Sequence, residues 1–265
     1  MRSISRARRR GDVVGGLILA ALALALVGGG VVFGLRRVDP VDPETFCALR
    51  HPPAAQVVIL VDSTDALEPR HRRRVEAAVR SEASRLAKGD RLTLASLSDK
   101  DPREPLILFS KCDPGDGASA NPLFQNGARL DARWRDAFGD PLAAAIARAV
   151  KGRIGEASPL TDAIRALAED PDFTSAPAQR RRLVIASDLM EHRPGEFSLY
   201  AAGATYQSFA RLQSGLRPPP DLTNVDVRLV QLDRPDREAR QLDARAAFWA
   251  PYFEAAHARD VRWDP

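Results

Sequence analysis

The sequence predicts a three-layer α/β fold, in which helices cover both faces of a mainly parallel β-sheet with one antiparallel edge strand. Two observations lead to this prediction. Short apolar runs rich in β-branched residues, such as VVILV at 57–61, have the composition of strands that are buried on both faces. Between most of these runs, apolar residues are spaced by three and four, as in amphipathic helices. Strands that alternate with helices form βαβ units, and we place this domain at residues 56–265.

The strands are expected at apolar or alternating runs that end at polar or turn-forming residues. Only six residues separate the second run from the third, whereas a parallel crossover needs about a dozen. These two runs are therefore predicted to form an antiparallel hairpin at one edge of the sheet. In chain order, the expected strands are 57–61, 91–98, 105–112, 182–187, 225–232 and a short edge strand at 261–263.

The helices are expected where apolar residues recur on one face. The first of them carries Val75, Ala78 and Val79 at this spacing, and Gly89 marks its end. The last one carries an aromatic cluster, which at this spacing indicates core packing and not a ligand site. In chain order, the expected helices are 68–88, 132–150, 159–169, 197–212 and 237–256, with a loop rich in Gly, Asn and Pro at 113–130.

A membrane anchor is expected before the domain. Residues 13–35 contain 23 consecutive positions without a charge, which as a helix would span about 34 Å against roughly 30 Å of hydrocarbon. A cleaved signal peptide is the alternative, because Ala21-Leu22-Ala23 has the pattern of a cleavage site, but the apolar run continues well beyond it. We predict a basic leader at 1–12, a transmembrane helix at 13–35 and a linker at 36–55.

The positive charge of the chain is confined to its N-terminus. Residues 1–12 hold five arginines and one aspartate, which account for the whole formal net charge of +4. A nucleic-acid-binding domain should have a basic surplus of its own, so nucleic acid is not an expected partner. More cations precede the apolar span than follow it closely, which predicts a cytoplasmic N-terminus. The expected location is a bacterial inner membrane, crossed once, with the domain in the periplasm.

Two aspartates follow buried strands at what should be the same edge of the sheet. Asp62 comes directly after the strand 57–61, and Asp188 directly after the strand 182–187. Ligands of such sheets bind beyond the carboxyl ends of the strands. Two carboxylates and neutral hydroxyls suit a hard cation and leave its charge partly unneutralised, so that an acidic group of a partner can complete its coordination.

Three short motifs in this order carry a resemblance to a known family. A strand ends in Asp62-Ser63-Thr64, Ser-Pro-Leu-Thr-Asp-Ala at 158–163 opens a helix, and a later strand ends in Ser187-Asp188. These resemble the three loop motifs of von Willebrand factor A (vWA) domains, and the resemblance covers about residues 55–265. It implies a Rossmann-like sheet with a metal-ion-dependent adhesion site, and a protein partner that offers an acidic side chain.

The resemblance also implies which residues bind the metal, Mg²⁺ or Mn²⁺. Ala66 departs from the family pattern Asp-x-Ser-x-Ser, because it stands where the last hydroxyl should be, and water or Asp65 would then replace that ligand. The alternative without a metal is that these polar residues form turns and cap the helices that follow. The expected ligands are Asp62, Thr64, Ser158 and Asp188, with Asp65 and Thr161 as alternative ligands.

The two cysteines are expected to form a disulfide bond. In the topology that the resemblance implies, the strand 105–112 returns antiparallel, so Cys112 lies at the edge of the sheet opposite to the site. Cys47 lies in the arm that enters the strand 57–61 at that same edge. One strand separates the two positions, roughly 10 Å, which the arm can cross. An extracytoplasmic location permits the bond Cys47–Cys112.

The function expected from these features is a membrane-anchored, vWA-like module that binds a protein and is not an enzyme. No HExxH, GxSxG or P-loop motif is present, and no small-molecule substrate is expected. A metal-free structural scaffold of a membrane complex is one alternative. A phosphatase similar to haloacid dehalogenases is another, with Asp62 as nucleophile, but Thr64 stands where that family has a second aspartate.

Overall fold

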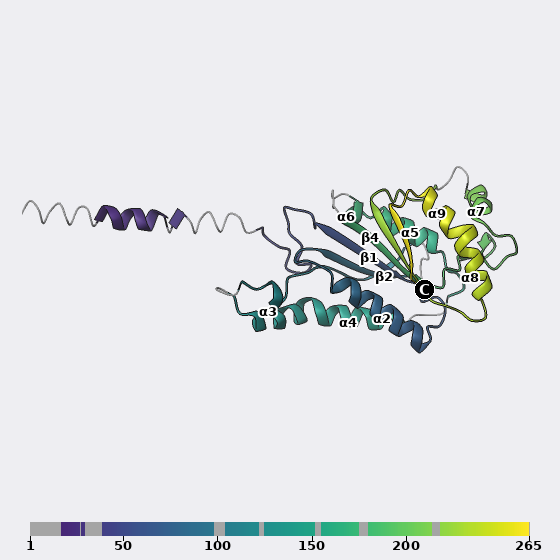
Figure 1. Cartoon of the computed structure of the whole chain (residues 1–265), viewed down its shortest axis with the longest axis horizontal. Coiled ribbons are helices and arrows are strands. Elements are labelled where there is room, and N and C mark those ends of the chain that lie inside the picture. The colour runs from purple at the N-terminus through teal and green to yellow at the C-terminus, as the bar shows by residue number, and fades with distance from the viewer. Residues whose placement is uncertain are drawn as a thin grey trace, which may run out of the picture. The chain divides into compact units, whose positions relative to one another are not determined.

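The structure is a computed structural model of the chain and is shown in Figure 1. The chain forms two compact units. One unit contains Met1–Pro40 and Leu49–His51, and the other contains Val41–Ala48 and Pro52–Pro265. Each unit is described by itself. The described residues are 17–26, 28–29, 39–97, 104–121, 125–151, 155–174, 180–213 and 218–264.

The first unit includes part of the predicted membrane anchor. Residues 17–26 are helical. Within the described ranges, no helix is both long enough and apolar enough to cross a membrane. The predicted leader 1–12 lies outside these ranges, as do residues 13–16, 27 and 30–35 of the predicted span. The transmembrane helix 13–35 stays a prediction.

The second unit is built on a six-stranded sheet with the order β3–β2–β1–β4–β7–β8. All neighbouring strands are parallel except β2 and β3, which form the predicted antiparallel hairpin at one edge. The α/β class with a mainly parallel sheet is therefore confirmed. The strands are β1 (Ala55–Val61), β2 (Arg91–Ser96), β3 (Leu106–Cys112), β4 (Arg180–Ser187), β7 (Val225–Gln231) and β8 (Asp260–Asp264).

Helices cover both faces of this sheet, which gives the three expected layers. Figure 1 shows α2, α3 and α4 along one side of the sheet and α5, α6, α8 and α9 along the other. One buried core lies on each side, so each central strand is apolar on both faces. The helices are α2 (Pro69–Ala83), α3 (Gly127–Trp134), α4 (Asp140–Lys151), α5 (Leu160–Ala168), α6 (Pro171–Thr174), α7 (Tyr206–Gln213), α8 (Glu238–Ala244) and α9 (Ala250–Ala255).

Local chemistry explains where the long helices begin. Glu68 caps α2 through a capping box with His71, so this helix starts where the sequence predicts, although it ends earlier, at Ala83. The Asn126 side chain accepts a hydrogen bond from the Arg129 amide, and α3 therefore begins inside the predicted loop. Short π-helical segments, 135–139 and 245–249, join α3 to α4 and α8 to α9.

The helix predicted at 197–212 is wrong over its first half. β5 (His192–Arg193) pairs with β6 (Phe197–Ser198) in a small antiparallel hairpin, and α7 begins only at Tyr206. Turns at 199–203 follow β6, and Gly203 adopts a φ of 73° there, which glycine tolerates without strain. Thr205 and Ser208 then exchange backbone-to-hydroxyl hydrogen bonds and cap the new helix.

The predicted disulfide Cys47–Cys112 is present in the structure. The two Cα atoms are 4.9 Å apart, and the Cys112 amide also donates to the Thr45 carbonyl at 2.8 Å. The bond closes a sequence separation of 65 residues and joins the linker to the end of β3. A cross-link across so long a loop removes conformational entropy from the unfolded chain.

Candidate functional site

The candidate site lies where β1 and β4, which are neighbours in the sheet, end. Val61 pairs with Ala186, and the Asp62 amide continues the ladder by donating to the Ala186 carbonyl at 2.8 Å. Asp62 and Asp188 therefore lie at the same end of the sheet. This end is formed by the carboxyl ends of the parallel strands, where ligands of such sheets bind.

The Asp62 carboxylate is the centre of a buried hydrogen-bond cluster. Its Oδ1 accepts from the Thr64 amide at 3.1 Å and from the Thr64 hydroxyl at 2.7 Å. Its Oδ2 accepts from the hydroxyls of Ser158 and Ser187 at 3.1 and 2.7 Å. The three hydroxyls come from two loops and from the last residue of β4, and the carboxylate joins these three segments.

The hydroxyl oxygens in this cluster differ in what they can still bind. The Ser187 oxygen accepts a hydrogen bond from the Leu189 amide at 2.8 Å, so its role is structural. Within the described part of the chain, the Thr64 and Ser158 oxygens accept no hydrogen bond, although both donate to Asp62. Their lone pairs are therefore free for a further ligand.

Backbone contacts place Ser158 beside Asp62. Ser158 and His192 exchange amide-to-carbonyl hydrogen bonds of 2.8 and 3.0 Å, so the second loop pairs with the segment after β4. The Gly155 amide donates to the Thr64 carbonyl at 2.9 Å, which joins the second loop to the first. Long-range backbone pairing of this kind cannot be predicted from the local sequence.

The alternative interpretation of these residues as helix caps is wrong. The N-cap of α2 is Glu68, which lies beyond Thr64 in the chain. The helix α5 begins at Leu160 with Pro159 at the N-cap position, so Ser158 precedes the cap. The polar side chains of the first two loops therefore serve the Asp62 cluster and not the helix ends.

Asp188 is buried next to this cluster, and few groups of the described residues within short hydrogen-bond distance balance the negative charge of its carboxylate. Its side chain is 6% exposed, and its Oδ1 accepts from the Met190 amide at 3.1 Å. The nearest donors to its Oδ2 are Arg237 Nη1 at 3.4 Å and Arg234 Nε at 3.7 Å. Burial, followed by the negative charge of Asp62, raises the pKa of Asp188 to about 7. A cation at this place would stabilise both carboxylates.

The loop after Asp188 is held in an uncommon backbone conformation. Leu189 has a φ of 61° and is nevertheless buried. Gln241 Nε2 donates to the Asp188 carbonyl at 2.9 Å, and Trp249 Nε1 donates to the Leu189 carbonyl at 2.7 Å. The C-terminal helices thus fix the backbone from which the Asp188 carboxylate projects.

Two arginines of the site, Arg234 and Arg237, were not predicted from the sequence. Arg237 Nη1 contacts Asp65 Oδ2 and the Tyr200 hydroxyl, both at 2.7 Å. Arg234 Nη1 donates to the Ala66 carbonyl at 2.9 Å, so a cation lies beside the residue that lacks the expected hydroxyl. Both arginines follow β7, the next parallel strand, and its carboxyl end meets the same edge of the sheet. That strand order was the signal that could have found them.

The two alternative ligands have other partners. Asp65 forms the ion pair with Arg237 at the rim and is 41% exposed. Thr161 donates its hydroxyl to Glu191 Oε1 at 3.1 Å and its amide to Glu191 Oε2 at 2.9 Å. Arg193 pairs with the same glutamate at 2.7 Å, in a buried network that is separate from the hydrogen bonds of Asp62.

The four expected ligands form a donor set that fits a hard cation in kind. Among the described residues, no group of three or more His, Cys, Asp or Glu side chains is placed to hold a metal. The site instead offers the carboxylates of Asp62 and Asp188 and the free hydroxyl oxygens of Thr64 and Ser158. Mg²⁺ accepts such oxygen ligands and keeps several waters of its own.

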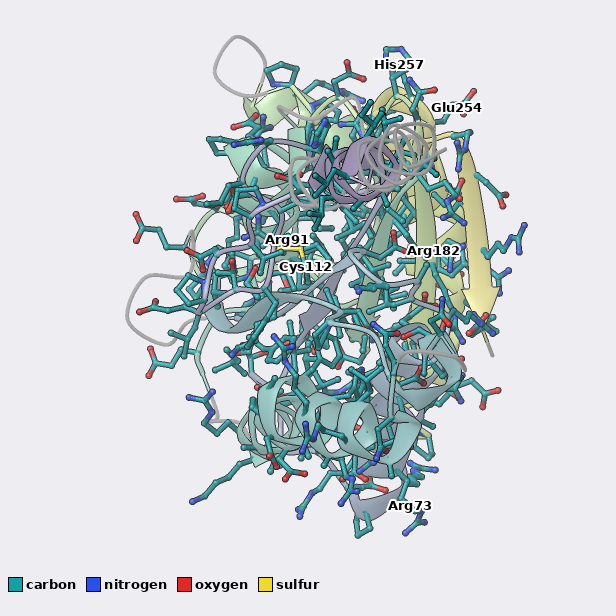
Figure 2. All side chains as sticks on the ribbon, turned by 90° about the vertical axis from the view of Figure 1, so that its left-hand side faces the viewer. Arg73, Arg91, Cys112, Arg182, Glu254 and His257 are labelled. Atoms are coloured by element: carbon teal, nitrogen blue, oxygen red, sulfur yellow. A yellow bond between two sulfur atoms is a disulfide. The ribbon has the colours of Figure 1, made fainter. Side chains whose placement is uncertain are left out.

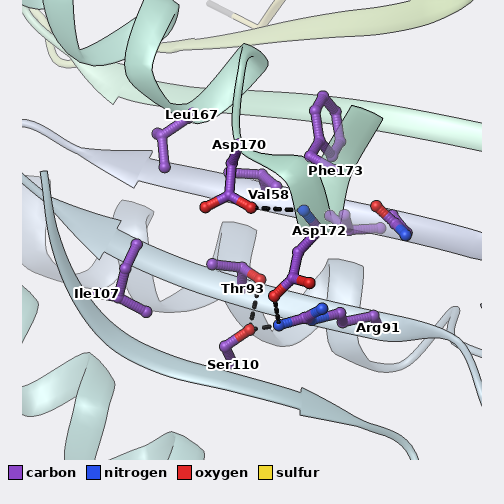
Figure 3. Close-up of a pocket in the computed structure, with 11 residues that line it drawn as sticks. Val58, Arg91, Thr93, Ile107, Ser110, Leu167, Asp170, Asp172 and Phe173 are labelled. Carbon is purple, nitrogen blue, oxygen red and sulfur yellow. Dashed lines mark hydrogen bonds and ion pairs between the residues drawn. The ribbon is translucent and has the colours of Figure 1, made fainter. Parts of the chain in front are cut away.

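A separate cavity of about 120 Å³ lies near the opposite ends of the strands. Figure 3 shows Arg91 joined to Asp172 and Ser110, and Thr93 joined to Ser110, beside the apolar side chains of Leu167 and Phe173. The ion pair between Arg91 and Asp172 measures 2.6 Å. These polar groups satisfy one another, and the cavity suggests no chemistry.

Similarity to known proteins is confined to the level of structure. No protein-family model matches the chain, and no curated protein matches it. Among solved structures, the chain is similar to the ArnB paralog VWA2 from Sulfolobus acidocaldarius, with 9% sequence identity and a TM-score of 0.40. The match covers 81% of this chain and 42% of that one, so the chain spans less than half of its length. A likeness this weak carries no argument about function.

Proposed function

We propose that this chain is a membrane-anchored, vWA-like module that binds a protein partner at the rim above Asp62 and Asp188. The proposal rests on one observation. Hydroxyls from two loops and from the end of β4 converge on the buried Asp62 carboxylate. The adjacent Asp188 is also buried, and its Oδ2 faces Arg237 and Arg234 at 3.4 and 3.7 Å. This arrangement stabilises an added Mg²⁺ or Mn²⁺, with Asp62, Thr64, Ser158 and Asp188 as its protein ligands.

The residues of the site would act together in recognition. Asp62 accepts the hydroxyl hydrogens of Thr64 and Ser158 and thereby directs the oxygen lone pairs of both residues away from itself. Asp188 supplies the second negative charge. A bound divalent cation would keep part of its charge and an open coordination position, which suits a carboxylate of the partner.

Two further features support a binding role outside the cytoplasm. Thr64 stands where a haloacid-dehalogenase-like phosphatase has its second aspartate, and it instead donates its hydroxyl to Asp62 Oδ1 at 2.7 Å, which argues against the phosphatase alternative. The cysteines pair in a disulfide bond, which persists in oxidising compartments. The bacterial inner membrane, a cytoplasmic N-terminus and a periplasmic domain stay predictions.

Metal binding is tested by thermal unfolding of the full chain in detergent. We expect Mg²⁺ or Mn²⁺ at 100 times its Kd to stabilise the domain by about 2.7 kcal/mol, because it binds only the folded state. Asp188→Asn should abolish this gain, because it removes one of the two charges that bind the ion. Asp113→Asn is the matched control, since Asp113 is also a buried aspartate but lies after β3, at the other edge of the sheet. An equal gain in Asp188→Asn would contradict the proposed ligand set.

Partner binding is tested by pull-down of the anchored chain from membranes, with and without a chelator. We expect a protein that is recovered in Mg²⁺ and lost both in chelator and with Asp188→Asn. Recovery of the same protein under all three conditions would instead support the metal-free scaffold. That second candidate is favoured by one observation, which is that Arg234 and Arg237 already bring positive charge to Asp188.

Arg237 should compete with the metal. Its guanidinium pairs with Asp65 and approaches Asp188, so it partly neutralises the charge that an ion would use. We expect Arg237→Gln to tighten Mn²⁺ binding about 3- to 10-fold, which corresponds to on the order of 1 kcal/mol for a partly exposed ion pair. Titration followed by the electron paramagnetic resonance signal of free Mn²⁺ measures this change. Arg240→Gln is the control, because Arg240 lies in α8 and donates to the Tyr200 carbonyl, and weaker binding in Arg237→Gln would contradict the competition.

A further inference from the structure

A second candidate binding site lies where the parallel strands begin, at the end of the sheet opposite to the Asp62 cluster. A cavity of about 270 Å³ opens between the C-terminal part of α2 and the first residues of β1 and β4. A water molecule takes up about 30 Å³ in the liquid, so this space is ample for a phosphate group. Its lining contains five arginines, which are Arg85, Arg180, Arg181, Arg182 and Arg259.

The carboxylates in the lining do not balance these arginines. Three acidic residues, Glu82, Asp90 and Asp226, also line the cavity. Five guanidiniums against three carboxylates leave an excess of two positive charges. Asp90 is in addition occupied by backbone amides, since it accepts from Ala55 at 3.0 Å and from Ala87 at 2.9 Å. The electrostatic character of the cavity is therefore that of an anion site.

The arginine donors are only partly used. Arg182 makes one bond of 2.9 Å to Glu82, and Arg85 reaches the same glutamate only at 3.5 Å. The Arg180 guanidinium has no hydrogen bond or ion pair with any residue that the structure describes. Arg180 and Arg182 alternate with Arg181 along β4, so their side chains leave the same face of the sheet, toward α2. Each guanidinium has five N–H donors, and several remain available.

The cavity lies at the end of the domain where the linker enters. Gln56, a lining residue of β1, lies opposite Arg91 in the neighbouring strand β2. Arg91 in turn lies opposite Cys112 in β3, and Cys112 forms the disulfide bond with Cys47 of the linker. Figure 2 looks onto this end, with Arg91 and Cys112 near its middle and Arg182 to their right.

We propose that this cavity binds a phosphate group through Arg85, Arg180 and Arg182. A phosphate dianion matches the two excess charges, and its oxygens accept the forked donors of guanidinium groups in pairs. The phosphate comes either from an anionic phospholipid, which would seat the domain on the membrane, or from a soluble phosphate compound. The site is independent of the cation site at the other edge of the sheet.

Calorimetric titration of the full chain in detergent with inorganic pyrophosphate tests this site. We expect binding that weakens at least tenfold in the double variant Arg85→Gln/Arg180→Gln. Both side chains are exposed, so the substitutions should leave the fold intact. Arg73→Gln is the matched control, because Arg73 is an exposed arginine of α2 that does not line the cavity and lies apart from Arg182 in Figure 2. Asp62→Asn should also bind pyrophosphate normally, which separates this proposal from the proposed function.

Nanodiscs distinguish the two sources of phosphate. If phospholipid occupies the cavity, pyrophosphate should bind more weakly in phosphatidylglycerol nanodiscs than in phosphatidylcholine nanodiscs. Equal affinity in both lipids, with the loss in the double variant retained, assigns the cavity to a soluble phosphate compound. The proposal is overturned if pyrophosphate fails to bind in detergent and in both nanodiscs, or if it binds the double variant as tightly as the unmodified chain.

Discussion

Replacing Trp249 with alanine is expected to lower the free energy of unfolding by about 3–5 kcal/mol. The side chain is fully buried between the sheet and the C-terminal helices. Its ring lies 5.0 Å from Phe248, 5.5 Å from Tyr252 and 5.8 Å from Phe253, measured between centroids. The substitution leaves a cavity that these rings cannot fill without leaving their own contacts. Urea unfolding followed by circular dichroism measures the loss, and a value below about 1 kcal/mol would contradict this packing.

The conservative change Trp249→Phe separates packing from support of the candidate site. It keeps an aromatic ring but removes the indole N–H that donates to the Leu189 carbonyl. That buried carbonyl would lose its partner, at a cost of about 1–3 kcal/mol, in the loop that directly follows Asp188. We expect Mn²⁺ affinity to fall more in Trp249→Phe than in Phe138→Leu, which affects the core on the other side of the sheet. An equal fall in both would show that stability alone controls the affinity.

Replacing Glu82 with alanine is expected to cost about 2–4 kcal/mol of stability. Glu82 is 1% exposed, and it accepts from Arg182 Nη1 at 2.9 Å and from Arg228 Nη1 at 2.8 Å. Without the carboxylate, two guanidiniums on neighbouring strands repel each other beneath α2. The expected cost is below that of a fully buried ion pair because both arginines keep some contact with water.

The control for Glu82 is Glu76→Ala, which changes a partly exposed glutamate in the same helix. We expect it to change stability by less than about 0.5 kcal/mol. Thermal unfolding and urea unfolding should agree on the difference between the two variants. If Glu82→Ala proves as stable as Glu76→Ala, the arginines must find other partners, and the charge inventory of the phosphate cavity would have to be revised.

Much of the fold follows from local pattern. The run at 57–61 is short, apolar at every position and rich in β-branched residues, which predicts a strand buried on both faces, and β1 lies inside the sheet between β2 and β4. The short connection between β2 and β3 predicted an antiparallel pair, and the structure confirms it. The segment 197–212 was misjudged because Phe197 and Leu199 bury their side chains from a hairpin. Burial alone does not tell a short strand from a helix.

The candidate site was also predicted only in part from the sequence. The sequence placed Asp62 and Asp188 at one edge of the sheet, because each directly follows a buried parallel strand. Ser187 was overlooked as an Asp62 partner, although it precedes Asp188 and its hydroxyl lies 2.7 Å from Asp62 Oδ2. Arg234 and Arg237 were overlooked because their positions depend on β7 lying next to β4. A charged side chain in a loop has no local signal that reveals its partner.

Periodicity, chain direction and connection length were enough to predict the fold class, the antiparallel edge strand and the two aspartates at the carboxyl ends of their strands. The cysteine pairing followed from the topology that the family resemblance implied. The groups that surround the aspartates, and the arginines that gather where the parallel strands begin, became known only from the folded structure. These groups cannot be read from local sequence, because hydrogen bonds and ion pairs join residues far apart in the chain, such as Asp65 and Arg237, which are 172 positions apart. Such contacts exist only once the strands have taken their order in the sheet.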